Sequence, residues 1–269
     1  MFDSGVGGLT VLHECLVSLP HEDFLYLGDT ARFPYGERTQ PQLRSYAHEL
    51  SSALMDRGAK LLVIACNSAT AAAFETVQAE LAGVVPVVGV VRPESRLAAQ
   101  ATRTGNVGVI ATEATVASGA YDRALAEASG GAAQLTSVAA PQLATLIQAG
   151  GEVDEATVAC VEQACAPLRD AGVDTVILGC THYPLVRPLL QRTLGRGVRL
   201  ISSGQAIAET VEAELEAAGS AAPETRRGAY HFLTTGEPEE FRTLGTRFLQ
   251  LPIAKVGHLQ AQPTQVTSA

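Results

Sequence analysis

One unit of sequence occurs twice in this chain, and it limits the fold more than any other feature. Each copy is an apolar run of strand length that ends in a cysteine, Cys66 or Cys180, and continues into small polar residues. A glycine precedes each cysteine at the same distance, Gly58 and Gly172, and a helix-like segment precedes each glycine. The cysteines lie 114 positions apart, and so do the glycines. The chain therefore uses one unit twice: helix, glycine stop, buried strand, cysteine and polar turn.

The apolar runs in this unit indicate the type of sheet. A continuous apolar strand such as Lys60–Ala65 is typical of a parallel sheet covered by helices on both faces. Ligands of such sheets bind beyond the carboxyl ends of the strands, where both cysteines are expected. We predict an α/β fold of two pseudo-symmetric lobes, each a parallel sheet flanked by helices, with the active site in the cleft between them.

The order of the elements suggests how the chain is shared between the lobes. Residues 1–91 and 203–269 are assigned to the first lobe and residues 92–202 to the second, with a crossing at Arg92-Pro93-Glu94. A length of 269 residues is enough for two such cores. The polar tail, 259–269, is predicted to be disordered. Apolar spacing predicts helices near 9–19, 39–58, 69–81, 118–127, 142–149, 155–171, 205–218 and 238–249, and strands near 24–27, 60–65, 84–91, 106–111 and 229–233.

Composition excludes several classes of protein. The net charge is −9 and no basic stripe is present, so nucleic acid is not an expected ligand. The most apolar window, 82–91, contains a proline and two glycines and is too short to span a membrane. No secretory leader is visible. The 5 cysteines form no disulfide framework, which favours a reducing cytoplasm, and three of them are interpreted as core residues: Cys15, Cys160 and Cys165.

Two thiols that face one cleft suit a particular reaction. One group can remove a proton from a carbon while the other returns a proton to the opposite face, which is racemisation. A thiolate serves as the base if a helix N-terminus or a neighbouring cation lowers its pKa, and both cysteines are expected at strand-to-helix junctions. Asp3, at the end of the first strand, and His182 are the candidates to assist proton movement on the two sides.

The polar residues near these positions carry mainly hydroxyl and amide groups. With helix N-termini they can hold substrate carboxylates without an arginine: Ser4, Asn67, Ser68, Thr112, Thr115 and Thr181. The chain has only two lysines, Lys60 and Lys255, neither an obvious host for a pyridoxal Schiff base. A mechanism without a cofactor is therefore predicted. Separately, no metal site is expected.

Several alternatives remain at this point. Cys66, Cys180 and His182 could imitate a three-ligand zinc site, although no fourth ligand is evident. A cysteine hydrolase using Cys180 with His182 is disfavoured, because residues two apart across a turn seldom align as nucleophile and base. The glycine-rich turn after Asp3 lacks the lysine of a phosphate-binding loop and the third glycine of a dinucleotide site. The loop 32–36 is either the wall of a pocket or a rigid surface turn.

Four long motifs resemble those of bacterial glutamate racemases, in the same order and over nearly the whole chain. They are Phe2–Thr10, Leu27–Gly36, Ala65–Thr70 and Leu178–Leu185. The resemblance implies a cofactor-independent cytoplasmic enzyme that interconverts L- and D-glutamate and supplies D-glutamate for peptidoglycan. It also implies that Cys66 takes the proton from D-glutamate and that Cys180 takes it from L-glutamate.

The resemblance also assigns substrate-binding residues. The matching pairs are Asp3-Ser4, Tyr35-Gly36, Asn67-Ser68 and Thr181-His182. Related aspartate racemases tend to carry Thr-Glu after the second cysteine, so Thr181-His182 favours glutamate, with an aspartate or other amino-acid racemase as the alternative. Racemases of this type often form homodimers, and some bind DNA gyrase, for which this sequence shows no dedicated extension. The chain departs from the family at Gln148, where a glutamate is common.

Overall fold

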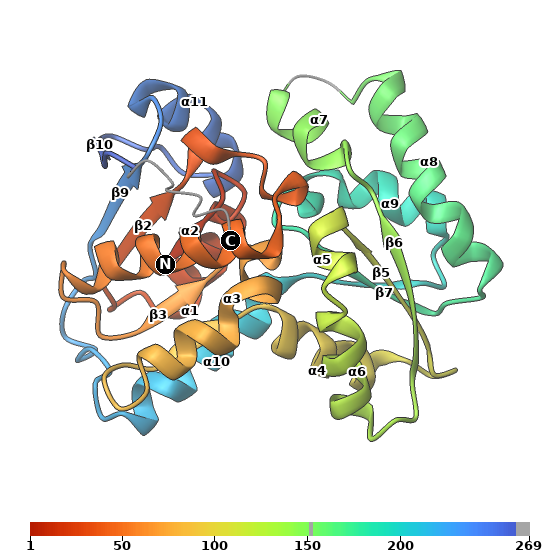
Figure 1. The fold of residues 1–269 in the computed structure, drawn as a ribbon, viewed down its shortest axis with the longest axis horizontal. Coiled ribbons are helices and arrows are strands. Elements are labelled where there is room, and N and C mark those ends of the chain that lie inside the picture. Colours follow the sequence, from red (N-terminus) through yellow and green to blue (C-terminus); the bar gives the residue numbers. More distant parts are fainter. Residues whose placement is uncertain (151–152, 262–269) are drawn as a thin grey trace.

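The computed structural model describes residues 1–150 and 153–261, and its strands form two separate parallel sheets (Figure 1). The first sheet has the order β10-β9-β2-β1-β3-β4. Its strands are β1 (Phe2–Asp3), β2 (Phe24–Gly28), β3 (Leu62–Ile64), β4 (Val87–Gly89), β9 (Tyr230–Thr234) and β10 (Val256–His258). The second sheet has the order β6-β5-β7-β8. Its strands are β5 (Asn106–Ala111), β6 (Gln134–Ala139), β7 (Thr175–Gly179) and β8 (Arg199–Ile201). The predicted α/β fold with two parallel sheets is confirmed.

Helices flank both sheets. Those in the part of the chain associated with the first sheet are α1 (Leu9–Ser18), α2 (Gln40–Met55), α3 (Asn67–Glu80), α10 (Ser203–Ala217) and α11 (Pro238–Leu249). Those associated with the second sheet are α4 (Val91–Ala101), α5 (Glu113–Ala117), α6 (Ala120–Ser129), α7 (Leu143–Ala149), α8 (Glu155–Asp170) and α9 (Arg187–Leu194). In packed pairs, α1 lies against α10, α2 against α3, α4 against α6 and α8 against α9. Figure 1 shows the two groups of elements side by side, with α4 and α10 near the junction.

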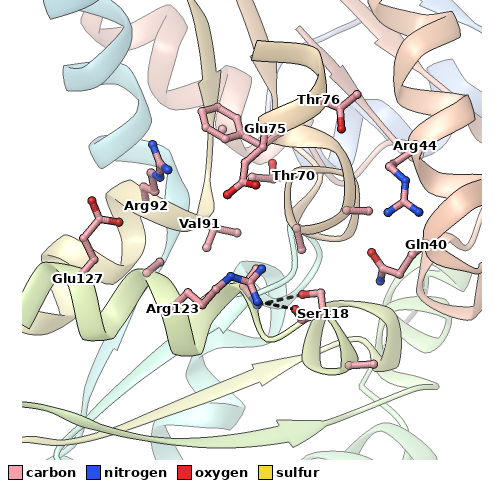
Figure 2. Close-up of a pocket in the computed structure, with 17 residues that line it drawn as sticks. Gln40, Arg44, Thr70, Glu75, Thr76, Val91, Arg92, Ser118, Arg123 and Glu127 are labelled. Carbon is pink, nitrogen blue, oxygen red and sulfur yellow. Dashed lines mark hydrogen bonds between the residues drawn. The ribbon is translucent and has the colours of Figure 1, made fainter. Parts of the chain in front are cut away.

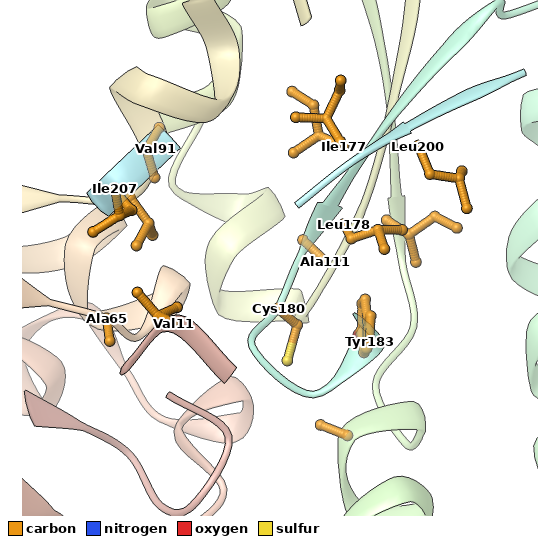
Figure 3. Packing of buried hydrophobic residues seen from close by; sticks show 14 of the residues in the cluster. Val11, Ala65, Val91, Ala111, Ile177, Leu178, Cys180, Tyr183, Leu200 and Ile207 are labelled. Carbon is orange, nitrogen blue, oxygen red and sulfur yellow. The ribbon is translucent and has the colours of Figure 1, made fainter. Parts of the chain in front are cut away.

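The repeated unit has the same backbone form in both copies. Gly58 and Gly172 follow the ends of α2 and α8 with φ of +77° and +62°, the left-handed conformation that glycine adopts without strain. Each glycine leads into a fully buried strand, β3 or β7. Figure 3 shows Cys180 on the loop after Leu178, at the end of β7. The duplication seen in the sequence is therefore a duplication of structure.

The crossing from the first sheet to the second contains a helix that was not predicted. Arg92, Pro93 and Glu94 lie in the first turn of α4, a helix that the periodicity did not reveal. Pro93 is tolerated there because the first turn of a helix does not need its N–H groups. The chain returns through α10, which begins at Ser203. The division at residues 91/92 and 202/203 stays a prediction.

Other elements were missed because they are short or polar. The edge strand β6 contains Gln, Thr and Ser side chains that are only partly buried, and β8 and β10 have three residues each. Leu259, at the start of the tail predicted to be disordered, donates its N–H to the Thr234 carbonyl at 2.8 Å, so this part of the prediction is wrong. The rest of that prediction falls mostly on residues 262–269, which lie outside the described residues.

Candidate active site

Cys66 and Cys180 line the same cavity, although they belong to different sheets. Cys66 lies just beyond the end of β3, and Cys180 just beyond the end of β7, which is the predicted position. The cavity has a volume of about 20 Å³, which is room for roughly one water molecule. Its walls come from both lobes: Ser4, Phe33, Pro34, Tyr35, Gly36, Glu37, Cys66, Asn67, Ser68, Thr112, Pro141, Ala144, Cys180, Thr181 and His182.

The surroundings of Cys66 combine a helix N-terminus with a carboxylate. Cys66 is the N-cap of α3, and the Ala69 N–H points at its Sγ at 3.5 Å. Burial raises the pKa of this thiol to about 12, and the negative charge of Asp3 adds to the rise, against hydrogen bonds from Ala69 and Ser4 that lower it. The thiol is therefore protonated at neutral pH in this structure, and Asp3 is the ionisable group beside it.

The surroundings of Cys180 contain an imidazole instead. The Nδ1 atom of His182 lies 3.8 Å from Cys180 Sγ, and its Nε2 atom lies 2.9 Å from Gln148 Oε1. An amide oxygen can only accept a hydrogen bond, so Nε2 carries the proton and Nδ1 can accept one from the thiol. Burial lowers the pKa of His182 to about 3, so the ring is neutral.

Neither thiol has the lowered pKa that a resting thiolate would need. Burial is the largest cause at both positions, and it also raises the pKa of Cys180 well above its usual range. The expectation of activation by a helix N-terminus or a cation is wrong for this conformation, because burial outweighs the Ala69 N–H at Cys66 and no cationic side chain is among the causes. A thiol at either position would have to lose its proton to a neighbouring group before it could act as a base.

Asp3 lies behind the cavity wall and joins the two lobes. Its side chain is fully buried, accepts the Gly5 N–H at 3.0 Å and accepts the Thr181 hydroxyl at 3.4 Å. Burial raises the pKa of Asp3 to about 6, although backbone hydrogen bonds lower it. The contact needs Gly7, since a Cβ there would lie 2.4 Å from both His182 Nδ1 and Thr181 Oγ1. The glycine-rich turn thus admits a close approach of the lobes.

Three hydroxyl groups from the two lobes meet in a triangle. Ser68 Oγ lies 2.8 Å from Thr112 Oγ1 and 3.1 Å from Thr115 Oγ1, and the two threonines are 2.9 Å apart. Ser68 and Thr112 line the cavity, whereas Thr115 is one hydrogen bond removed from it. The structure therefore brings together hydroxyl groups that the sequence separates widely.

Residues 33–36 of the loop 32–36 form a wall of the cavity, so the pocket alternative for this segment is confirmed. Tyr35 donates its hydroxyl to Asp29 Oδ2 at 2.5 Å, and Thr235 donates to the other oxygen of Asp29 at 2.6 Å. Gly36 lies against Thr112 of the other lobe, where a Cβ would come within 2.8 Å. Asp29 was not among the predicted residues, although it lies inside a motif already noted.

Gln148 is the other residue that sequence reasoning left without a role. Its Oε1 atom accepts the hydrogen bond from His182 Nε2, and the residue comes from α7. Its position in the sequence was recognised, but only the fold shows that it reaches the imidazole.

The metal alternative finds no support in the described residues. Within residues 1–150 and 153–261, no group of three or more His, Cys, Asp and Glu side chains is arranged to hold an ion. Over the same ranges, every helix is too short or too polar to cross a membrane.

A larger groove, of about 710 Å³, lies apart from the cysteine cavity and shares no lining residue with it (Figure 2). It runs between α2 and α3 of the first lobe and α5 and α6 of the second, and three arginines line it, Arg44, Arg92 and Arg123. None of the predicted site residues lines it. The cysteine cavity is therefore the candidate active site despite its small size.

Comparison with known proteins decides the family. The family model described as Asp/Glu/Hydantoin racemase matches residues 12–211. The chain belongs to this racemase family. This family member is accordingly a racemase, an enzyme of the isomerase class. A glutamate racemase of Carnobacterium sp. (strain St2) is 41% identical to it over 259 residues, which cover 96% of each chain.

Solved structures of family members have the same fold. A glutamate racemase isoform from Bacillus anthracis superposes on this racemase with a TM-score of 0.89 and 36% identity, covering 97% of this chain and 96% of the other. The glutamate racemase of Francisella tularensis, solved in complex with D-glutamate, gives a TM-score of 0.88 and 29% identity, with 96% of each chain covered. The predicted family is confirmed.

Proposed function

We propose that this racemase interconverts L- and D-glutamate without a cofactor, by proton transfer at the α-carbon between Cys66 and Cys180. The observation that carries the proposal is that both thiols line one cavity from opposite lobes, each beside a different proton acceptor. The glutamate names and the D-glutamate complex among its relatives support this substrate.

The proton balance follows from the groups in the site. For D-glutamate, Cys66 passes its proton to Asp3, and the thiolate then takes the α-proton. The carbanion takes a proton on its opposite face from the Cys180 thiol, which gives L-glutamate. Cys66 is then a thiol and Cys180 a thiolate, and exchange with Asp3, His182 Nδ1 and solvent restores the starting state. For L-glutamate the roles reverse, with His182 Nδ1 accepting the proton of Cys180.

The other cavity residues are proposed to bind the substrate. Hydroxyl, side-chain amide, imidazole and backbone N–H groups hold the polar groups of the substrate: Ser4, Tyr35, Gly36, Asn67, Ser68, Thr112, Thr115, Thr181 and His182. Since the cavity has room for roughly one water molecule, the lobes must separate to admit an amino acid. We further propose, from the family, that the product D-glutamate serves peptidoglycan synthesis in the cytoplasm, and that the enzyme forms homodimers.

The test is incubation of the purified protein with L-glutamate in heavy water, with chelator and without added cofactor. Circular dichroism follows inversion, and proton NMR follows loss of the Cα hydrogen. We expect inversion together with deuterium uptake. Exchange of aspartate but not glutamate would contradict the proposed substrate, and exchange only after a metal is added would contradict the mechanism.

A further inference from the structure

A buried carboxylate at the junction of the lobes has no part in the mechanism above. Glu94, in α4, is 0% exposed, and none of the described ion pairs includes it. Burial raises the pKa of Glu94 to about 7. A buried carboxylate without a cation must be satisfied by neutral donors, because an uncompensated charge is costly in the interior.

Three donors satisfy Glu94, and each comes from a different helix. The Asn67 amide nitrogen lies 3.1 Å from Oε2, the Tyr121 hydroxyl also donates to Oε2, and the Ser203 hydroxyl donates to Oε1. Asn67 begins α3, Tyr121 lies in α6 and Ser203 begins α10. Glu94 therefore links both segments that cross between the lobes to one helix of each lobe.

The hydrogen bonds fix the orientation of the Asn67 amide. Its nitrogen has two hydrogens, and it contacts two acceptors, Glu94 Oε2 and the Tyr121 hydroxyl oxygen at 2.7 Å. The hydroxyl proton of Tyr121 goes to Glu94, so all three groups are paired consistently. A flipped amide would place its oxygen against the carboxylate, which is repulsive.

This orientation leaves one atom of Asn67 for a ligand. The residue follows Cys66 directly and lines the cavity, and it is only 2% exposed. Its Oδ1 is buried and has no hydrogen-bond partner among the described residues. A buried acceptor without a partner is unfavourable, so a donor that enters the cavity gains by pairing with it. The ammonium group of an amino acid carries only donors.

We propose that Glu94, with Tyr121, is a positioning residue that turns the Oδ1 atom of Asn67 toward the ammonium group of the substrate. The inference rests on the proposed function, and it adds the group of the substrate that Asn67 recognises. It also explains why a carboxylate occupies a buried site at the junction of the lobes without a cation.

The test compares glutamate with glutarate, which has both carboxylates but no ammonium group. The racemisation assay gives kcat and KM for glutamate, and competitive inhibition by glutarate gives its Ki. In Glu94→Leu the Asn67 amide loses one of its two acceptors, and the Tyr121 hydroxyl becomes free to donate to a flipped amide. We therefore expect KM for glutamate to rise about tenfold while Ki for glutarate changes less than about twofold. The change in kcat should be smaller than the change in KM.

Two matched variants separate orientation from mere support of the fold. In Glu94→Gln the new amide oxygen can accept hydrogen bonds from Asn67 and Tyr121, while the new amide nitrogen donates to the Ser203 hydroxyl. The ratio of KM for glutamate to Ki for glutarate should therefore stay within about twofold of the wild-type ratio. Ser203→Ala removes one hydrogen bond to Glu94 but none to Asn67, and it should also leave the ratio unchanged. The proposal would be overturned if Glu94→Leu weakened the binding of glutamate and of glutarate equally. It would also be overturned if KM for glutamate rose as much in Glu94→Gln as in Glu94→Leu.

If Glu94→Leu does not fold, Tyr121→Phe serves in its place, because it removes one acceptor of the Asn67 amide and keeps the carboxylate. We expect KM for glutamate to rise about threefold while Ki for glutarate stays nearly constant. An equal change in KM for glutamate and in Ki for glutarate would contradict the proposal. Failure of the proposed function is distinguishable, since the unchanged protein would then show no racemisation of glutamate at all.

Discussion

The two halves of the active site share a backbone plan but differ in the partner that each thiol is given. On the Cys66 side, the sulfur caps a helix of 14 residues and lies near the buried carboxylate of Asp3. On the Cys180 side, a short 3-10 turn follows, and the neutral imidazole of His182 approaches the sulfur at 3.8 Å. The position of the thiol is thus alike in the two halves, while the neighbouring group differs: a carboxylate beside Cys66 and an imidazole beside Cys180.

This difference has a chemical consequence. The two enantiomers of a substrate are mirror images, but the residues that assist their deprotonation need not be. Asp3 is protonated below a pH of about 6 and negatively charged above it, whereas His182 stays neutral down to a pH of about 3. In the proposed mechanism, the two directions of the reaction therefore depend on groups of different charge, which can be disturbed separately.

The largest effect is expected when either thiol is replaced. In Cys66→Ser and in Cys180→Ser, racemisation should fall at least about 10³-fold, because a hydroxyl is a far weaker acid than a thiol and one proton transfer is lost. Circular dichroism with each enantiomer measures the rate. Cys160→Ser, at a half-buried cysteine outside the cavity, is the control and should keep full activity. Full racemisation in either site variant would exclude the two-thiol mechanism.

Replacing the two acceptors tests whether they serve opposite sides. Asp3→Asn and His182→Asn should each lower kcat about 10²-fold. Since the enantiomers have equal free energy, kcat/KM must remain equal in both directions, and the asymmetry appears in isotope effects. We expect the kinetic isotope effect of α-deuteration on the racemisation rate to be larger for D-glutamate than for L-glutamate in Asp3→Asn. In His182→Asn it should be larger for L-glutamate than for D-glutamate. The same pattern in both variants would show that the sides are not distinct.

The pH dependence sharpens the same comparison. Burial raises the pKa of Asp3 to about 6, so its base form is lost as the pH falls through that value. We expect kcat/KM to decline below about pH 6 by up to tenfold per pH unit. This acidic limb of the pH–rate profile should disappear in Asp3→Asn. His182, with a pKa lowered to about 3, should contribute no limb in this range. A limb that persists unchanged in Asp3→Asn would assign it to another group.

A smaller effect is expected at the residue that orients the imidazole. In Gln148→Leu, His182 loses the acceptor at Nε2, and its tautomer is no longer fixed, so kcat should fall about tenfold. Gln148→Glu keeps an acceptor there and should retain most of the activity. Equal losses in the two variants would mean that the size of the side chain matters and its hydrogen bond does not.

The smallest effect on activity is expected where the two halves are alike. Gly58→Ala and Gly172→Ala place a side chain at a positive φ with no atom within 4 Å, so each should lower the free energy of unfolding by about 1–2 kcal/mol and leave kcat unchanged. Thermal unfolding and the racemisation assay measure the two quantities. A loss of kcat in Gly58→Ala alone would break the equivalence of the copies.

Gly7→Ala serves as the contrasting variant. Its Cβ would collide with His182 and Thr181, so it should abolish activity.

The sequence by itself determined the parts that depend on local pattern. The apolar runs before Cys66 and Cys180 indicated buried parallel strands, and the repeat at a fixed offset placed both thiols at the ligand ends of their sheets. Apolar spacing predicted most of the helices, such as α11, at their observed positions. These features could be predicted because burial on one or both faces leaves a period in the sequence.

Only the tertiary structure decided which groups distant in the sequence meet. No local pattern shows that Gln148 reaches His182, or that Glu94 joins Asn67, Tyr121 and Ser203, because these contacts depend on the relative placement of distant helices. Burial of the thiols likewise reversed the expected direction of their pKa shift. Desolvation is a property of the whole packed interior, and a motif of a few residues carries no record of it.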